Sequence, residues 1–339
     1  MADGLQSKRV VFAGKGQVEV RQEGIGEPGP GQVLVEAGAS LISTGTECII
    51  LQQLYEAGSH WDNWVRFPFQ AGYSMVGRVV AVGDGVKGVE PGRRLAVRAG
   101  HAQRFLTSRW VATVPDGLPD TEAAWFALAC IVQNGIRRAQ IVLGETVVII
   151  GLGILGQLAC QYAKVCGARR VIAVDPAADR LRTAQRCGAT HGLAMPVAEA
   201  VDAVRTITGG ALADVVFDVT GHAAVFSAAL GMVRRLGRLM LLGDTGTPSQ
   251  QHLTADVITR GISIIGTHDG NPPAEGNDWY PWSHARMAEV FFDLLAQGRL
   301  NVRDITSHVV SPLDAPQVYR GLVERRGEHL GVVFDWSRV

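Results

Sequence analysis

The pattern of hydrophobic and polar positions divides the chain into two parts. Up to about residue 120, short apolar runs alternate with turn sequences such as EPGPGQ, GDGVKG and EPGRR. This pattern predicts short β-strands joined by tight turns and favours a small antiparallel barrel. The predicted strands are Val10–Phe12, Val18–Val20, Val33–Ala37, Val76–Val82, Arg94–Val97 and Trp110–Val114.

From about Glu122 the pattern changes to apolar runs that alternate with helical segments, which is typical of a doubly wound parallel α/β sheet. The predicted strands of this sheet are Val147–Ile150, Val171–Val174, Val215–Val219, Leu239–Leu242 and Ile262–Ile265. The remaining residues predict a helix at about Ala285–Gln297, a strand at Thr306–Val310, a helix opened by Leu313–Ala315 and a last strand at Gly331–Asp335.

Residues 146–175, TVVIIGLGILGQLACQYAKVCGARRVIAVD, predict a dinucleotide-binding unit of strand, glycine turn, helix, strand and acid. The first glycine permits the tight turn, the second lets the backbone approach a pyrophosphate, and the third lets helix and strand pack closely. The helix N-terminus offers free N–H groups to phosphate. The alternative is a turn that serves packing alone. The predicted phosphate-binding residues are Gly151, Gly153, Ile154, Leu155 and Gly156.

Asp175 ends the second strand of this unit, where a carboxylate accepts hydrogen bonds from ribose hydroxyls and repels a 2′-phosphate. We therefore expect NAD rather than NADP as the cofactor. Arg180 is expected at the adenosine end, unless it is a solvated helix cation. Ligands bind at the carboxyl ends of strands in such sheets. The further cofactor-binding residues predicted there are Thr220, Gly243, Thr245 and Thr267.

Length, charge and cysteine content restrict the class of protein. A chain of 339 residues suggests two domains. The 32 basic and 32 acidic residues balance, which gives no electrostatic basis for binding nucleic acid or an anionic membrane. The polar start MADGLQSKR predicts no signal peptide, and no apolar run is long enough for a membrane span. Five cysteines without a CxxC pair predict a reduced, cytoplasmic protein.

A series of motifs follows along the chain: PGPGQVLVEAGASLISTGTE, QAGYSMVGRVVAVGDGVKGVEPGRRL, ETVVIIGLGILG, VIAVD, GRLMLLG and SHVVSPLDAPQVY. In order and spacing they resemble the medium-chain dehydrogenase/reductase superfamily. The resemblance implies a GroES-like β-barrel catalytic domain, formed by both chain ends, and an inserted Rossmann doubly wound parallel sheet. We expect residues 1–122 to form the first part of the catalytic domain, 123–271 the nucleotide domain and 272–339 the return. A homodimer or homotetramer is also implied.

Zinc-dependent members of that superfamily have ligands that this chain lacks. Thr44 stands in place of the first cysteine ligand, Tyr73 in place of the histidine and Ser74 in place of the neighbouring acid. Only Cys130 lies where a third ligand belongs, and zinc needs three protein ligands and a water molecule. We therefore predict no metal. The alternative is that Cys48 becomes a ligand through a register shift of four residues.

The chain thus resembles the zinc-independent branch of the superfamily. Its ISTGTE and GYSxVG sequences are similar to bacteriochlorophyllide dehydrogenase and to sugar- or cyclitol-dehydrogenase-like relatives. The zinc-independent assignment agrees with a further departure: between residues 97 and 101 the chain lacks the cysteine-rich lobe that holds a structural zinc.

Without a metal, hydrogen-bond donors must hold the reacting oxygen. Thr46 occupies the position of a proton-relay hydroxyl, or it stabilises a turn. Tyr73 is predicted to donate to an alkoxide, or to act as a base if its pKa is depressed; the alternative is that it fills space. Glu47 is included with the catalytic candidates, although a structural role is preferred. His268 is a candidate acid or base, unless it is a solvent-facing loop residue.

The segment HDGNPPAEGNDWYPWSH, residues 268–284, looks like an insertion relative to the superfamily. Its aromatic side chains suit either a wall over a sugar-like substrate, or an oligomer contact or anchored surface loop. Trp61 falls in a segment that commonly borders the substrate cleft, with packing as the alternative. The predicted substrate-contacting residues are Thr44, Trp61, Cys130, Trp279 and Trp282.

Together these observations predict an NAD-dependent, zinc-independent oxidoreductase. We expect it to interconvert a secondary alcohol and a ketone on a polar, cyclic, sugar- or cyclitol-like substrate. One alternative is an NAD(P)H-dependent quinone or enoyl reductase that acts on an activated C=C bond. The other alternative is a non-catalytic nucleotide-binding protein.

Overall fold

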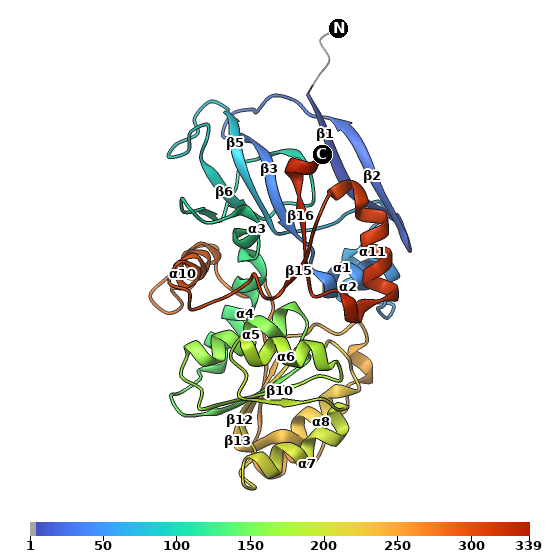
Figure 1. The fold of residues 1–339 in the computed structure, drawn as a ribbon, viewed down its shortest axis with the longest axis vertical. Helices are drawn as coiled ribbons and strands as arrows, with labels where there is room; N and C mark the ends of the chain where they lie inside the picture. Colours follow the sequence, from blue (N-terminus) through green and yellow to red (C-terminus); the bar gives the residue numbers. More distant parts are fainter. Residues whose placement is uncertain (1–4) are drawn as a thin grey trace.

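The computed structural model describes residues 5–339 and shows two lobes stacked along the long axis (Figure 1). Over these residues the strands form three sheets, of three, six and seven strands. Both ends of the chain, drawn in blue to cyan and in red, contribute to the upper lobe in Figure 1, and the green to orange segments form the lower lobe.

The lower lobe is built on the parallel sheet. Its strands, in spatial order, are β11 (His191–Leu193), β10 (Arg170–Val174), β9 (Thr146–Ile150), β12 (Ala213–Asp218), β13 (Val233–Leu241) and β14 (Ser263–Gly266). The central strand β9 is buried along its whole length, because helices cover both faces of a parallel sheet. This is the doubly wound arrangement that the alternating pattern predicted.

Alternate residues of the central strands pack into two apolar cores. Val147 and Ile149 face the core that includes α4, α5 and α10, and Val148 and Ile150 face the one that includes α7 and α8. Burial of each such side chain contributes about 1.5–3 kcal/mol. The helices of this part are α4 (Phe126–Ala139), α5 (Ile154–Val165), α6 (Ala178–Arg186), α7 (Val197–Ile207), α8 (Val225–Met232), α9 (Asp256–Arg260) and α10 (His284–Ala296).

The upper lobe contains the largest sheet, in which the chain ends meet. Its order is β15 (Thr306–Val310), β16 (Gly331–Asp335), β3 (Val33–Leu41), β5 (Met75–Val82), β6 (Arg94–Val97) and β8 (Ala112–Thr113), and β7 (Arg104–Thr107) also pairs with β3. Val333 of β16 lies opposite Leu41 of β3. The C-terminal strands therefore share a sheet with the N-terminal ones, while the boundaries at residues 122 and 271 stay predictions.

Smaller elements complete the upper lobe. The third sheet consists of β2 (Gln17–Gly24), β1 (Gln6–Gly14) and β4 (Phe69–Gln70). The helices are α1 (Thr44–Gln52), α2 (His60–Trp64), α3 (Asp120–Ala123) and α11 (Ala315–Glu324). Single 3₁₀ turns span Pro248–Gln250, Pro312–Asp314, Arg326–Glu328 and Trp336–Arg338.

Local structure departs from the sequence prediction at the start of α1 and at three short strands that were not predicted, β4, β7 and β11. The TGTE segment begins the helix α1 rather than forming an isolated turn, and Glu47 accepts the Ser43 N–H at 2.7 Å, which satisfies a free donor of the first turn. The edge strand β11 was not predicted, because it is three residues long and reads HGL, without the β-branched residues that signal a strand.

Candidate active site

The glycine turn has the geometry that a bound pyrophosphate requires. Gly151 has φ +89°, a conformation that favours glycine. A Cβ on Gly156 would lie 1.9 Å from the Gly151 carbonyl oxygen, so no larger residue fits between strand and helix. By contrast, a Cβ on Gly153 would meet no atom within 4 Å. The backbone at Gly153 is thus open to a ligand, at the N-cap of α5, where Ile154 and Leu155 lie in the first turn.

Asp175 lies directly after β10, next to this turn. Its two carboxylate oxygens accept the N–H groups of Leu152, at 2.7 Å, and Ala177, at 2.8 Å, and the residue is 5% exposed. Arg180 Nη1 lies 4.0 Å from the carboxylate, while its Nη2 donates to the Arg326 carbonyl at 2.7 Å. Arg180 is therefore partly buried between the two lobes and is not a solvated helix cation.

The other predicted cofactor residues lie at the carboxyl edge of the parallel sheet. The Thr220 hydroxyl donates to Asp218 at 2.7 Å, which orients it beside Gly151. A Cβ on Gly243 would lie 2.4 Å from the Gly221 nitrogen, so this strand end also needs glycine. Thr245 and Thr267 are buried, and the Thr267 hydroxyl donates to a β13 carbonyl at 3.1 Å. This edge contacts the upper lobe after β13, where the Glu56 N–H donates to the Gly246 carbonyl at 2.8 Å and His60 Nε2 lies 2.8 Å from Asp244.

Three strand ends of the large sheet meet at one position on the facing lobe. Met75 of β5 pairs with Ser40 of β3 and with Val97 of β6. The residues just beyond these strand ends therefore lie together. Tyr73 is one of them, and its hydroxyl donates to Ser43 Oγ at 2.7 Å. Burial raises the pKa of Tyr73 to about 12, although the Ser43 hydrogen bond opposes the rise. At neutral pH Tyr73 is thus a proton donor and not a free base.

A charged cluster lies against Tyr73. The Arg98 guanidinium carbon is 5.8 Å from the centre of the Tyr73 ring. Arg98 binds Asp269 through both terminal nitrogens, one of them at 2.9 Å. His284, the first residue of α10, contacts the same carboxylate at 3.2 Å. Burial raises the pKa of Asp269, but the His284 hydrogen bond and the Arg98 charge outweigh it and lower the pKa below its usual value.

His268 is not the residue of this segment that reaches the cluster. It is exposed, its Nδ1 accepts the Gly270 N–H at 3.1 Å, and its backbone N–H donates to Asn271. These contacts curl its loop back on itself. The neighbouring Asp269, which begins the turn after β14, is the residue that contacts the cluster, while the role of His268 as acid or base stays a prediction.

Glu47 belongs to a buried hydrogen-bond network and not to the open site. It is 1% exposed, it accepts the Tyr319 hydroxyl, and it lies 3.2 Å from His101 Nε2. The other imidazole nitrogen of His101 lies 2.8 Å from Ser40 Oγ. Both carboxylate oxygens of Glu47 thus have hydrogen-bond partners within the protein. Glu47 therefore holds α1 and its neighbours in place, which removes it from the catalytic candidates.

Most of the predicted substrate residues are used for packing. Thr44 and Trp61 are buried. Cys130 is fully buried, its thiol donates to the His284 carbonyl at 3.6 Å, and burial raises its pKa to about 12. Thr46 is half-buried in the first turn of α1. Cys130 thus contacts His284 of the cluster, Thr44 is buried at the start of α1, and Thr46 is the more accessible of the two threonines.

The aromatic residues of the insertion differ in exposure. Trp279 is 96% exposed. Trp282 contacts two guanidinium groups, with Arg137 at 3.1 Å and Arg286 at 4.4 Å from its ring centre. These contacts fix the insertion to α4 and α10 through cation–π stacking. The loop is therefore anchored by Trp282 and exposes Trp279, and the two substrate assignments stay predictions.

The residues present do not fit a zinc ion. At the expected position the side chains are two hydroxyls, from Thr44 and Tyr73, and the guanidinium of Arg98 lies beside them. A cation at this point disfavours a second cation. Among residues 5–339, no group of three His, Cys, Asp or Glu side chains is arranged to hold a metal. Cys48 is buried and belongs to no such group among these residues.

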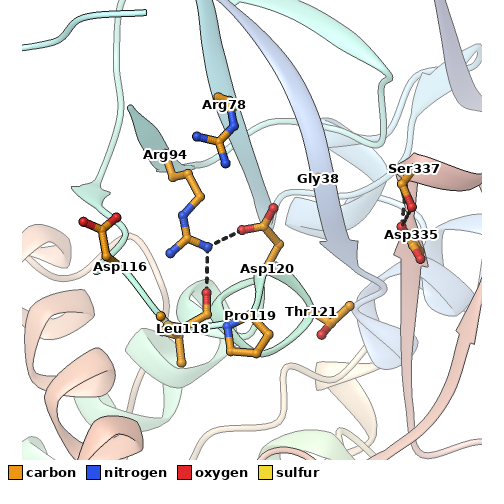
Figure 2. A pocket seen from close by; sticks show the side chains of 11 residues that line it. Gly38, Arg78, Arg94, Asp116, Leu118, Pro119, Asp120, Thr121, Asp335 and Ser337 are labelled. Atoms are coloured by element: carbon orange, nitrogen blue, oxygen red, sulfur yellow. Dashed lines mark hydrogen bonds and ion pairs between the residues drawn. The ribbon is translucent and has the colours of Figure 1, made fainter. Parts of the chain in front are cut away.

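A separate groove of about 680 Å³ lies in the upper lobe (Figure 2). Arg94 on β6 donates to Asp120 at 2.7 Å and to the Leu118 carbonyl at 2.6 Å there. These bonds tie β6 to α3. The residues that line this groove include none of the predicted site residues.

Two family models match the sequence and together cover about two thirds of it. One is the alcohol dehydrogenase GroES-like domain, over residues 29–118, and the other is the zinc-binding dehydrogenase domain, over residues 155–287. The chain belongs to the medium-chain dehydrogenase/reductase superfamily. It is an oxidoreductase of alcohol-dehydrogenase type, with a GroES-like domain and a Rossmann-type parallel sheet.

Characterised relatives and solved structures are similar over most of the chain. D-guloside 3-dehydrogenase of Escherichia coli K12 is 29% identical, over 78% of each chain. Sorbitol dehydrogenase of Bacillus subtilis is 28% identical, over 57% of this chain and 63% of its own. A Sinorhizobium meliloti 1021 protein solved with NADP superposes with a TM-score of 0.79 at 23% identity, covering 98% and 99%. An E. coli CFT073 alcohol dehydrogenase solved with NADH gives 0.81 at 18%, covering 98% and 100%.

Sequence reasoning missed four residues of the cluster: Ser43, Arg98, Asp269 and His284. A signal was present for two of them. Arg98 directly follows the predicted strand Arg94–Val97, and Asp269 lies shortly after the predicted strand Ile262–Ile265. Polar residues just beyond strand ends are the ones a sheet presents to a ligand.

Proposed function

We propose that the protein is an NAD-dependent, zinc-independent dehydrogenase that interconverts a secondary alcohol and a ketone on a polyol- or sugar-like substrate. The observation that carries this proposal is the position of Tyr73. Its hydroxyl, bonded to Ser43 and close to Arg98, lies where the upper lobe faces the carboxyl edge of the nucleotide sheet. The substrate class is supported by similarity to D-guloside 3-dehydrogenase and sorbitol dehydrogenase.

The nucleotide site fits a nicotinamide dinucleotide, and structures of the same fold hold NADP or NADH. The open backbone at Gly153 and the first turn of α5 suit the pyrophosphate. We infer NAD because Asp175 follows β10 next to the glycine turn, where a carboxylate is expected to accept from the ribose and to repel a 2′-phosphate. The bound nicotinamide ring supplies or accepts the hydride.

In ketone reduction, Tyr73 donates its hydroxyl proton to the substrate oxygen while the hydride reaches the carbon. Tyr73 is left as a phenolate, which regains a proton from water through Ser43. In alcohol oxidation the phenolate accepts the alcohol proton. Because its pKa is raised to about 12, the phenolate is scarce at neutral pH and becomes more abundant as pH rises. Oxidation should therefore speed up steadily toward alkaline pH, with no plateau below about pH 10.

The test combines Tyr73→Phe with metal analysis. We expect kcat for NAD-linked sorbitol oxidation to fall at least tenfold, about 1.4 kcal/mol of transition-state stabilisation. Tyr280→Phe is the matched control, because it also removes one hydroxyl donor, at 2.8 Å from Asn134, but lies in the anchored loop. Near-wild-type rates in Tyr73→Phe, or stoichiometric zinc in protein prepared without chelator, would contradict the proposal.

The two alternative functions make different predictions in the same assay. A quinone or enoyl reductase should oxidise NADPH with an activated alkene and leave polyols unchanged. A non-catalytic nucleotide-binding protein should bind NAD and turn over neither class. The buried Asp175 carboxylate favours the alcohol dehydrogenase, because quinone and enoyl reductases of this branch more often resemble NADPH users.

We infer further that the protein is a cytoplasmic homodimer or homotetramer. Its cysteines are free, which supports a reducing compartment. The edge strand β14 and the exposed side chains of Leu253 and Ile258 support self-association through the nucleotide lobe. Among the described residues no helix is long and apolar enough to cross a bilayer. Sedimentation velocity tests the assembly, and a monomer at micromolar concentration would contradict it.

A further inference from the structure

The pairing of β5 with β6 places Arg98 beside Tyr73. Because Met75 of β5 pairs with Val97 of β6, the residue after β6 is placed beside the residues before β5. The result is a guanidinium 5.8 Å from the Tyr73 ring centre, within the range of a cation–π contact. A positive charge at this distance stabilises negative charge on the ring and its oxygen.

Asp269 and His284 fix the orientation of Arg98. The Asp269 carboxylate binds both terminal guanidinium nitrogens and also contacts His284 Nε2 at 3.2 Å. Asp269 follows β14 of the nucleotide sheet, whereas Arg98 follows β6 of the upper lobe. The pair therefore links the two lobes where the cofactor edge meets Tyr73.

Arg98 retains hydrogen-bonding capacity after these contacts. Its Nη2 also reaches the Ala127 carbonyl at 3.5 Å, and its buried Nε has no acceptor among the described residues. The buried Nε groups of Arg137, Arg180 and Arg238 have no acceptor among these residues either, so this donor alone does not set Arg98 apart. What sets it apart is the position of its guanidinium beside the Tyr73 ring, where a charge can act on the phenol.

In the part of the chain that the structure describes, three charged side chains act on the Tyr73 hydroxyl. The charges that act on it are those of Arg98, Asp269 and Glu47. Cys130 borders the Arg98–Asp269 pair and has a pKa raised to about 12 by burial, so it stays neutral. Glu47 is held by its own hydrogen-bond network. Arg98 is thus the cation that opposes two carboxylates at Tyr73.

We propose that Arg98 is a positioning residue of the reaction: its guanidinium, held by Asp269 and His284, stabilises the negative charge that develops on Tyr73 and on the substrate oxygen bound by that hydroxyl. This inference rests on the proposed function. It adds a cation that acts through Tyr73, and it assigns Asp269 and His284 the role of holding that cation.

The experiment measures sorbitol oxidation with NAD between about pH 6 and pH 10 in four variants. Arg98→Ala should raise the pKa of Tyr73 and displace the rising limb of log kcat toward higher pH by at least one unit, a loss of at least about tenfold at fixed pH. Arg98→Lys should restore part of the loss, since it keeps the charge. Asp269→Asn keeps an amide oxygen that can still accept from Arg98 and hold the guanidinium, but it removes a charge that opposes the phenolate. It should therefore displace the rising limb toward lower pH.

Arg94→Ala is the matched control. Arg94 is the first residue of β6, after which Arg98 follows, and it also forms a partly buried ion pair, with Asp120 (Figure 2). The Arg94→Ala variant should have a lower melting temperature, and the rising limb of its log kcat against pH should stay where it is in the wild type. Guanidinium chloride at about 50 mM, well below denaturing concentrations, should restore part of the activity of Arg98→Ala and none of that lost in other variants.

The outcomes separate this inference from the proposed function. If Tyr73→Phe is inactive and the Arg98→Ala profile superimposes on that of the wild type, the inference is wrong and the proposed function stands. If Arg98→Ala and Asp269→Asn move the limb in the same direction, the pair is structural and the inference is also wrong. If Tyr73→Phe keeps its activity, the proposed function itself fails. Opposite displacements with unchanged NAD affinity would support the proposal.

Discussion

The nucleotide site and the substrate end of the cleft are built in different ways. The nucleotide site is formed mainly by the backbone of one continuous segment, with a glycine turn, a helix N-terminus and an acid within residues 146–175. The substrate end is formed by side chains from four separate segments, which supply Ser43, Tyr73, Arg98 and Asp269. Changes at the first site should act through local geometry, and changes at the second through charge and proton transfer.

The largest effect is expected at the glycine turn. Gly156→Ala places a methyl group 1.9 Å from the Gly151 oxygen, which the turn cannot accommodate without moving. We expect a loss of about 2–4 kcal/mol in the free energy of unfolding and loss of NAD binding. A methyl group on Gly153 would meet no atom within 4 Å, so Gly153→Ala should keep the free energy of unfolding unchanged. Because the methyl group would occupy the space expected for the pyrophosphate, NAD affinity should nevertheless fall at least about tenfold. Urea unfolding and NAD titration distinguish the two, and equal stabilities would contradict the geometry.

Glu47→Gln tests whether the buried network is structural. The substitution removes a buried charge that contacts Ser43 N, His101 and Tyr319. We expect a loss of about 2–3 kcal/mol in the free energy of unfolding, because the partners of a buried charge are left poorly satisfied. The rising limb of kcat should keep its slope and move toward lower pH by less than in Asp269→Asn, because the Glu47 charge acts on Tyr73 more weakly than that of Asp269. Loss of the rising limb at normal stability would return Glu47 to the catalytic group.

Asp175→Ala tests cofactor choice at the nucleotide site. We expect the NAD/NADP preference in kcat/KM to fall at least about tenfold, because the repulsion of a 2′-phosphate is lost. The Leu152 and Ala177 N–H groups also lose their acceptor, so a small loss of stability should accompany the change. Steady-state kinetics with both cofactors measures the ratio. An unchanged ratio would remove Asp175 from cofactor selection.

The smallest effect is expected in the insertion. Trp279→Ala removes a side chain that is 96% exposed, so kcat/KM should stay within about twofold and stability within about 0.5 kcal/mol. Trp282→Ala removes the ring between Arg137 and Arg286, and it should cost about 1–3 kcal/mol. Thermal unfolding and sorbitol kinetics measure both. A rise in KM in Trp279→Ala alone would support the predicted aromatic wall.

Sequence periodicity predicted most strands of both sheets, because each strand is long enough to show its own apolar pattern. It missed the short strands β4, β7 and β11, which have two to four residues, and the helical start of α1. His268 and Asp269 show the limit within the site. Both follow β14 as polar residues, and only the direction of the chain after the strand decides which one reaches Arg98.

The sequence by itself determined the nucleotide unit, because the turn, the helix and the acid that form it are close neighbours in the chain and need only local backbone geometry. Only the tertiary structure decided the substrate end. Arg98 reaches Tyr73 through the pairing of β5 with β6, and Asp269 reaches Arg98 across the two lobes, 171 residues further along the chain. Contacts of that separation leave no periodic signal, because they depend on how whole sheets are placed against each other.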